Sequence, residues 1–91
     1  MNNVDRFAAI TKEMAEIYKN KNHDYGNSFD DTCDKFGIIA AVVRMYDKLN
    51  RLATLSKNNE NRVNESISDT LIDLANYAIM TVIWMENGKD K

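Results

Sequence analysis

The stretch "ESISDTLIDLANYAIM", which runs from Glu65 to Met80, decides the fold of this chain. Its apolar residues recur at intervals of three and four, the spacing of a helix with a buried face. Glu65, Asp69 and Asp73 also recur every fourth residue, so they share one side of that helix. Carboxylates are costly to bury unless something pairs with them. The stretch therefore predicts a core helix whose acids need cations or a metal ion.

The helix predicted from this stretch spans about residues 63–87, with Gly88 as the residue that ends it. It is apolar nearly all round, which is typical of a helix buried on several sides. At about 1.5 Å per residue its length is roughly 36 Å, more than a lone three-helix domain of this mass needs. We therefore expect a homo-oligomeric bundle in which this helix is central.

Two further helices are expected, because the chain has no proline and only three glycines. Apolar residues at helical spacing predict one helix over about 3–21 and another over about 32–56. Between them, residues 20–31 are rich in Asn, Asp, Gly and Ser, which favours a loop. The predicted fold is all-α, with three helices in a single domain over residues 1–91.

The composition narrows the classes of protein to which the chain can belong. Hydrophobic residues make up 44% and charged residues 29%, and the net charge of −2 argues against a general nucleic-acid binder. One cysteine, Cys33, fits a reducing cytosol. We expect no signal peptide at the N-terminus, and no membrane span, since acids interrupt the apolar segment. The expected location is cytoplasmic, in the host cell if the chain is viral.

The acids of the core helix are candidate ligands of a divalent cation. Mg²⁺ or Mn²⁺ takes carboxylate oxygens together with water or phosphate, and acids one helical turn apart can converge on one ion. Asp47 of the preceding helix is the fourth candidate, with Glu65, Asp69 and Asp73. The alternatives are a structural salt bridge for Asp69 and Asp73, and a favourable position in the first helical turn for Glu65. Asn76 continues the same face and is a candidate for contact with a substrate.

A stripe of charge on the predicted helix 32–56 is the second constellation. Arg44, Lys48 and Arg51 are candidates for binding phosphate, because arginine offers a planar fork and lysine a point charge. The alternative is a solvated face, since Arg44 and Lys48, and also Asp47 and Arg51, are spaced for contact within the helix. Acids beside cations form the pattern of a nucleoside polyphosphate site.

The polar segment that follows the first predicted helix supplies the third set. Lys21, His23 and Tyr25 are candidates for contact with a substrate, because tyrosine stacks on bases and histidine contacts phosphate or sugar. A lone histidine in a polar loop is otherwise simply exposed to solvent.

Three stretches together resemble a known family. They are "KNHDYGNSF" (21–29), "VRMYDKLNRL" (43–52) and "ESISDTLIDLANYAI" (65–79), and they resemble the all-helical family called nucleotide modification associated domain 1, often encoded by bacteriophages. That family is similar to the MazG and dimeric dUTPase group of NTP pyrophosphohydrolases. The resemblance implies Mg²⁺ held by helix-borne acids and cleavage of NTPs to NMP and pyrophosphate.

The sequence departs from the acid pattern of the pyrophosphohydrolases at two places. Arg44 and Asp47 occupy a position that resembles a pair of acids, and the later acids are spaced by four residues instead of three. The leading expectation is binding of a nucleotide with Mg²⁺, with pyrophosphohydrolysis as the reaction. In it Asp47 and Asp73 act as catalytic residues, one carboxylate deprotonating a water that attacks phosphorus. The alternatives are a non-catalytic protein that sequesters a signalling nucleotide, and a purely structural helical oligomer.

Overall fold

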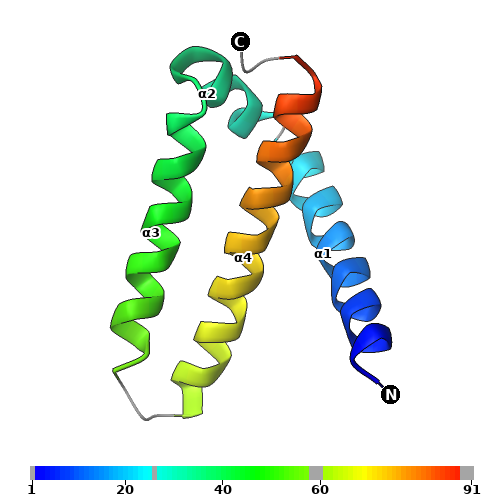
Figure 1. The fold of residues 1–91 in the computed structure, drawn as a ribbon, viewed down its shortest axis with the longest axis vertical. Coiled ribbons are helices and arrows are strands. Elements are labelled where there is room, and N and C mark those ends of the chain that lie inside the picture. Colours follow the sequence, from blue (N-terminus) through cyan, green and yellow to red (C-terminus); the bar gives the residue numbers. More distant parts are fainter. Residues whose placement is uncertain (1, 26, 58–60, 89–91) are drawn as a thin grey trace.

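The computed structural model describes residues 2–25, 27–57 and 61–88, and of residues 23–25 and 61–64 it describes the backbone alone. This part of the chain forms helices and contains no strand, so the all-α class is confirmed. The helices are α1 (Asn3–Tyr25), α2 (Ser28–Phe36), α3 (Ile39–Leu55) and α4 (Asn61–Glu86), as Figure 1 shows. The described residues thus contain four helices, where the sequence predicted three.

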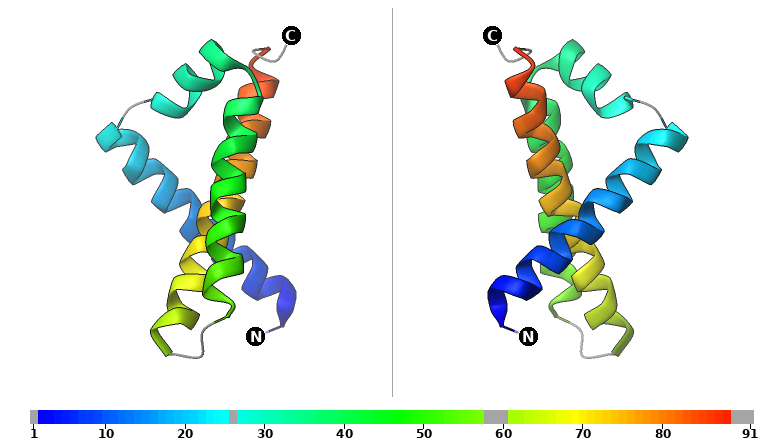
Figure 2. Two further views of the ribbon diagram at one scale, coloured as in Figure 1. Left: turned by 90° about the vertical axis from the view of Figure 1, so that its left-hand side faces the viewer. Right: turned by 90° about the vertical axis from the view of Figure 1, so that its right-hand side faces the viewer.

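The hairpin of α3 and α4 is the centre of the structure. The two helices run antiparallel, side by side, and make the most extensive contact between any two elements (Figure 1). Helix α1 crosses α4 and contacts it over a short length, and α2 leads back from α1 to the start of α3 (Figure 2). No described helix combines the length and hydrophobicity needed to cross a lipid bilayer.

The predicted loop over residues 20–31 is wrong, because α1 continues to Tyr25 and α2 begins at Ser28. Asparagine, histidine and aspartate are weak helix formers, but each costs well under about 1 kcal/mol, and no glycine or proline occurs before Gly26. A helix already started therefore continues through them. The start of α1 at Asn3 agrees with the predicted span, and Asn2 caps the helix, since its Oδ1 accepts a hydrogen bond of 2.8 Å from the Asp5 N–H.

The predicted helix over residues 32–56 is interrupted at Gly37, which divides it into α2 and α3. Gly37 has φ 82° and ψ −174°, a combination that only glycine adopts readily. Its N–H donates to the carbonyl oxygen of Cys33 at 2.7 Å and closes α2. The apolar run around it hides this break, because the hydrophobic pattern continues unchanged on both sides.

Replacing Gly37 with alanine is expected to lower the free energy of unfolding by about 1–3 kcal/mol. A Cβ at this position meets no atom within 4 Å, so the cost comes from the backbone conformation alone. Urea unfolding followed by circular dichroism, at one chain concentration, measures it. Asn20→Ala, at an exposed position in α1, serves as the control and should change stability by less than about 0.5 kcal/mol. Equal stability of Gly37→Ala and the parent protein would contradict the prediction.

Helix α4 matches the expected span of 63–87 to within two residues at each end. Gly88 follows it with φ 74°, and its N–H donates to the Met85 carbonyl at 3.0 Å. The prediction that this glycine terminates the helix is confirmed.

A small core lies where α2, the start of α3 and the end of α4 meet. Its buried side chains are Phe29, Cys33, Ala41 and Trp84. The Trp84 Nε1–H donates to Asp34 Oδ1 at 2.9 Å, which satisfies the one polar atom of a side chain that is only 1% exposed. This core holds α2 against the hairpin and so positions the site described next.

Candidate functional site

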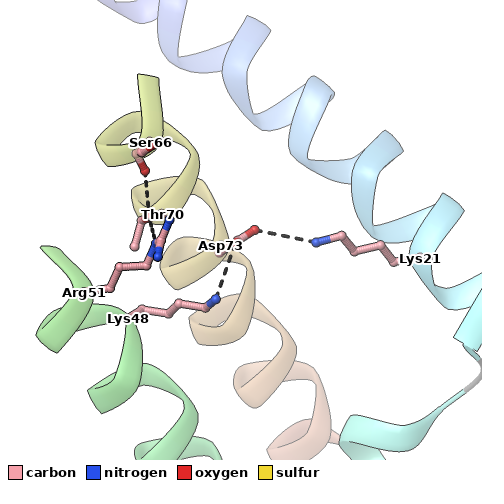
Figure 3. A network of polar contacts seen from close by, with 6 residues as sticks. All are labelled: Lys21, Lys48, Arg51, Ser66, Thr70 and Asp73. Carbon is pink, nitrogen blue, oxygen red and sulfur yellow. Dashed lines mark hydrogen bonds and ion pairs between the residues drawn. The ribbon is translucent and has the colours of Figure 1, made fainter. Parts of the chain in front are cut away.

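Asp73 stands between two lysines that come from different helices. Its Oδ1 lies 3.6 Å from Lys21 Nζ of α1, and its Oδ2 lies 3.6 Å from Lys48 Nζ of α3 (Figure 3). The Asp73 side chain is 35% exposed, so solvent reaches all three charged groups. Both distances exceed those of a tight charge-assisted hydrogen bond, so neither lysine is firmly held by the carboxylate.

The groups around Asp73 line a pocket of about 200 Å³, which we call the cationic pocket. All four helices contribute to its wall. The lining residues are Tyr18, Lys21 and Asn22 of α1, Ser28 and Phe29 of α2, Arg44 and Lys48 of α3, and Asp73, Asn76, Tyr77 and Met80 of α4. Segments far apart in the sequence therefore meet at one place.

The charges of the cationic pocket do not balance. Lys21, Arg44 and Lys48 contribute three positive charges and Asp73 one negative charge, so the described lining carries a formal charge of +2. Partly enclosed cations in such a pocket attract anions more strongly than the same cations on an open surface do. A bound anion with two or more negative charges would offset the excess.

One side of the cationic pocket is aromatic. The rings of Phe29 and Tyr77 lie with their centroids 5.7 Å apart, and the Arg44 guanidinium lies 6.0 Å from the Tyr77 centroid. The aromatic contact orients Arg44 from one side, because cations are attracted to the face of a ring. A planar base can pack against apolar surface of this kind.

Arg51 occupies a different environment from the other two cations of α3. Its Nε–H donates to Thr70 Oγ1 at 3.2 Å, and the Thr70 hydroxyl donates to the Ser66 carbonyl at 2.7 Å (Figure 3). Arg51 does not line the cationic pocket. It links α3 to α4 one turn away from Asp73, and its expected contact with phosphate stays a prediction.

The four predicted metal ligands are spread over the surface. Asp47 and Glu65 are exposed and line neither pocket, whereas Asp69 lines a second pocket with Glu13 and Asp73. This pocket has a volume of about 520 Å³. Within the part of the chain that the structure describes, no three His, Cys, Asp or Glu side chains are grouped so that they could hold a metal ion.

The two pockets differ in the charge of their linings as well as in volume. The second pocket is lined by two cations, Arg6 and Lys21, and by three acids, which gives a formal charge of −1. Lys21 and Asp73 belong to both linings, so they form the wall between them. An anionic ligand is therefore suited to the cationic pocket.

Several of the residues predicted to contact a substrate line one pocket, and others have side chains that the structure does not describe. Lys21, Arg44, Lys48 and Asn76 all line the cationic pocket. The side chains of His23 and Tyr25 lie outside the described residues, so their roles stay predictions. Sequence reasoning did not place Tyr77 or Phe29 in a site. Tyr77 had a usable signal, since it follows Asp73 by four residues and so shares its side of α4.

Cys33 is buried against Ala41 and Trp84 and is 1% exposed. Burial, and then the negative charge of Asp30, raise the pKa of its thiol above the ordinary value of 9.0. The thiol therefore stays protonated near neutral pH, and it is a member of the core without the accessibility or ionisation of a nucleophile.

The raised pKa of Cys33 predicts a loss of stability in alkaline solution. Above about pH 9.0 the unfolded chain releases the thiol proton while the folded chain retains it, so folding becomes less favourable as the pH rises. Below that pH both states keep the proton and the group contributes no pH dependence. We expect the free energy of unfolding to fall more steeply between pH 9 and 10 in the parent protein than in Cys33→Ala. Parallel curves for the two proteins would contradict the assignment.

Comparison with known proteins identifies the family. The family model described as nucleotide modification associated domain 1 matches residues 21–85, which include all of α2 and α3, nearly all of α4 and the lining of the cationic pocket except Tyr18. No curated protein and no solved structure matches the chain. Because the match covers well over half of the 91 residues, this chain belongs to the nucleotide modification associated domain 1 family.

Proposed function

We propose that this protein binds a nucleotide or nucleoside polyphosphate, with the phosphates in the cationic pocket. The observation that carries the proposal is the convergence of Lys21, Arg44 and Lys48, from two helices, around one carboxylate. The family description, which associates the domain with nucleotide modification, is consistent with this ligand class.

In the binding geometry that we propose, the cations of the pocket hold the phosphates and its aromatic side holds the base. Phosphate oxygens contact the Arg44 guanidinium and the Lys21 and Lys48 ammonium groups, which all donate hydrogen bonds. The base packs against the aromatic side. A pocket of about 200 Å³ is smaller than the roughly 300–1,000 Å³ of typical small-molecule sites, so part of the nucleotide extends into solvent.

Mg²⁺ is proposed as an ion that arrives with the phosphates. It commonly keeps several waters and binds through one or two carboxylates and substrate phosphates. Among the described residues, Asp73 is the carboxylate of the cationic pocket and would hold such an ion from the protein side. Since no group of three ligands is present there, we derive no catalytic step through the metal. The catalytic roles expected for Asp47 and Asp73 stay predictions.

The first experiment is a panel of nucleoside mono-, di- and triphosphates, deoxynucleotides and signalling nucleotides, each with Mg²⁺, Mn²⁺ or EDTA. The melting temperature reports binding, and released pyrophosphate reports hydrolysis. A shift without pyrophosphate supports binding or sequestration, and pyrophosphate with one substrate supports the pyrophosphohydrolase. No shift and no release with any compound would overturn the proposal and leave Asp73 in a structural salt bridge.

Asp73→Asn separates the two roles that the carboxylate has in this proposal. In EDTA the variant should bind a nucleoside monophosphate more tightly, by about two- to tenfold, because one competing negative charge has been removed. Addition of Mg²⁺ should raise the affinity of the variant for a triphosphate by less than it raises the affinity of the parent protein, because the variant has lost the protein ligand of the metal. Isothermal titration calorimetry measures both. An unchanged response to Mg²⁺ would remove Asp73 from metal binding.

A further inference from the structure

One copy of the chain exposes more surface than a monomer of its mass should. Its accessible surface is 6958 Å², whereas a folded monomeric protein of 10.5 kDa exposes about 5,400 Å². Its radius of gyration of 14.7 Å also exceeds the roughly 12 Å expected for this length. The excess area, roughly 1,500 Å², is within the range that one partner buries in a stable homodimer.

Helix α3 carries an exposed apolar stripe, which we call the α3 seam. Its residues are Ile39, Val42, Tyr46, Leu49 and Ala53. The intervals of three, four, three and four are those of the seam in a helical coiled coil. The four larger side chains are each 46% to 61% exposed, so the helices described here leave the seam uncovered.

Helix α4 carries a second stripe of the same kind, the α4 seam. It consists of Leu71, Ala75, Ala78, Val82 and Met85, with intervals of four, three, four and three. Leu71, Val82 and Met85 are 45% to 53% exposed. Like the α3 seam it contains no charged residue, and the two alanines at its centre allow another helix to approach closely.

Both seams lie on the same side of the α3–α4 hairpin. On α3, Val42 follows the buried Ala41 by one residue, and on α4, Met85 follows the buried Trp84. One residue turns a helix by about 100°, and in an antiparallel pair that rotation brings Val42 and Met85 to one common side. The other residues of each seam lie within about 80° of these two, so each stripe begins on that side and extends over the outer face of its helix.

The cationic pocket lies on the other side of the hairpin. Asn76 and Met80 line it, and they precede residues of the α3-facing side, Tyr77 and Thr81, by one position. These residues are therefore rotated from the α3-facing side in the direction opposite to the seams, which places the pocket on the opposite side of the hairpin. Figure 2 agrees, since α2 and the C-terminal half of α1, which complete the pocket, lie together on one side of the hairpin.

We propose that the two seams together bind the same two seams of a second copy, forming a four-helix bundle at the centre of a homodimer. A two-fold axis brings the same surface of both copies into contact, so that surface must be complementary to itself. Two adjacent stripes without charged residues meet this condition. Contact through the seams and the residues that flank them would bury part of the excess area that the single chain exposes. The proposal uses no property of the nucleotide site, so either can fail without the other.

The mass of the parent protein in solution is the first test. Size-exclusion chromatography with light scattering at about 100 µM chain should give twice the mass of 10.5 kDa, and dilution should lower the melting temperature. A mass of one chain at that concentration would overturn the proposal, and would leave the seams to a different protein or to solvent.

Two adjacent valines offer a matched pair for locating the interface. Val42 belongs to the α3 seam, whereas Val43 lies about 80° around the helix from the centre of the seam. The two side chains are exposed to a similar degree, 46% for Val42 and 54% for Val43. Val42→Glu should convert the dimer to monomer at 100 µM, whereas Val43→Glu should keep the mass of the dimer. The same mass for both variants would refute the assigned seam.

A milder pair keeps the test valid if Val42→Glu does not fold. Val42→Thr and Val43→Thr preserve the shape of the side chain and replace one methyl group with a hydroxyl, so each chain retains its helix. The dissociation constant should rise about tenfold for Val42→Thr and by less than about twofold for Val43→Thr. Equal dissociation constants, measured by sedimentation equilibrium, would again overturn the interface.

Discussion

Trp84→Ala is expected to lower the free energy of unfolding by about 3–5 kcal/mol, the largest effect of any single substitution considered for this protein. The indole is 1% exposed and packs in the cluster formed by Phe29, Cys33 and Ala41. Removing it leaves a cavity where three helices meet. Domains of this length have a total stability of roughly 5–14 kcal/mol, so the loss is a large share of it. Urea unfolding followed by far-ultraviolet circular dichroism measures the change.

Two control variants assign the cost of Trp84→Ala to its cause. Trp84→Phe keeps an aromatic ring but loses the hydrogen bond from Nε1 to Asp34, and should cost about 1–2 kcal/mol. Phe36→Ala removes an aromatic side chain that is 62% exposed and should cost less than about 1 kcal/mol. Similar losses for Trp84→Ala and Phe36→Ala would show that the cluster is not the stabilising core.

Lys48→Gln is expected to weaken the binding of a nucleoside triphosphate by about 10- to 100-fold at low salt. This prediction rests on the proposed function. The substitution removes one of the three cations of the pocket and a charge-assisted hydrogen bond to phosphate. Stability should change by less than about 1 kcal/mol, because the contact between Lys48 and Asp73 is 3.6 Å long and partly exposed to solvent. Isothermal titration calorimetry gives the affinity, and thermal unfolding gives the stability.

Lys12→Gln is the matched control for Lys48→Gln. It makes the same change of charge at an exposed position of α1 that lines neither pocket. Its affinity for the triphosphate should stay within about twofold of the parent value, because solvent screens a distant surface charge. If both lysine variants lost affinity equally, binding would depend on the net charge of the protein, and the cationic pocket would not be the site.

Helical periodicity was a reliable guide wherever one pattern continued without interruption. It predicted the all-α class, the extent of α4 to within two residues and the termination at Gly88. It failed at Gly37, where apolar residues continue through a change of backbone direction. A hydrophobic pattern records which side of the chain is buried, and it does not record a single residue whose φ is positive.

The candidate site was predictable only in part, for a related reason. The sequence placed Asp73 and Asn76 on one side of a helix, and Arg44 and Lys48 on one side of another, because spacing along a helix determines which residues share a side. It could not show that Asp47, although it is next to Lys48 in the chain, would lie outside the pocket that Lys48 lines. Adjacent residues on a helix point about 100° apart, and only the position of the neighbouring helix decides which of them faces it.

By itself the sequence determined the helices that can form and the side of each that carries charge or apolar residues, since both depend on contacts between residues a few positions apart. The tertiary structure alone decided that Lys21 of α1 would approach Asp73 of α4, and that Arg51 would contact Thr70 and lie outside the pocket. These encounters join residues 19 to 52 positions apart. They depend on the crossing of α1 over α4 and on the corner at Gly37, which the packing of the helices sets and no local spacing encodes.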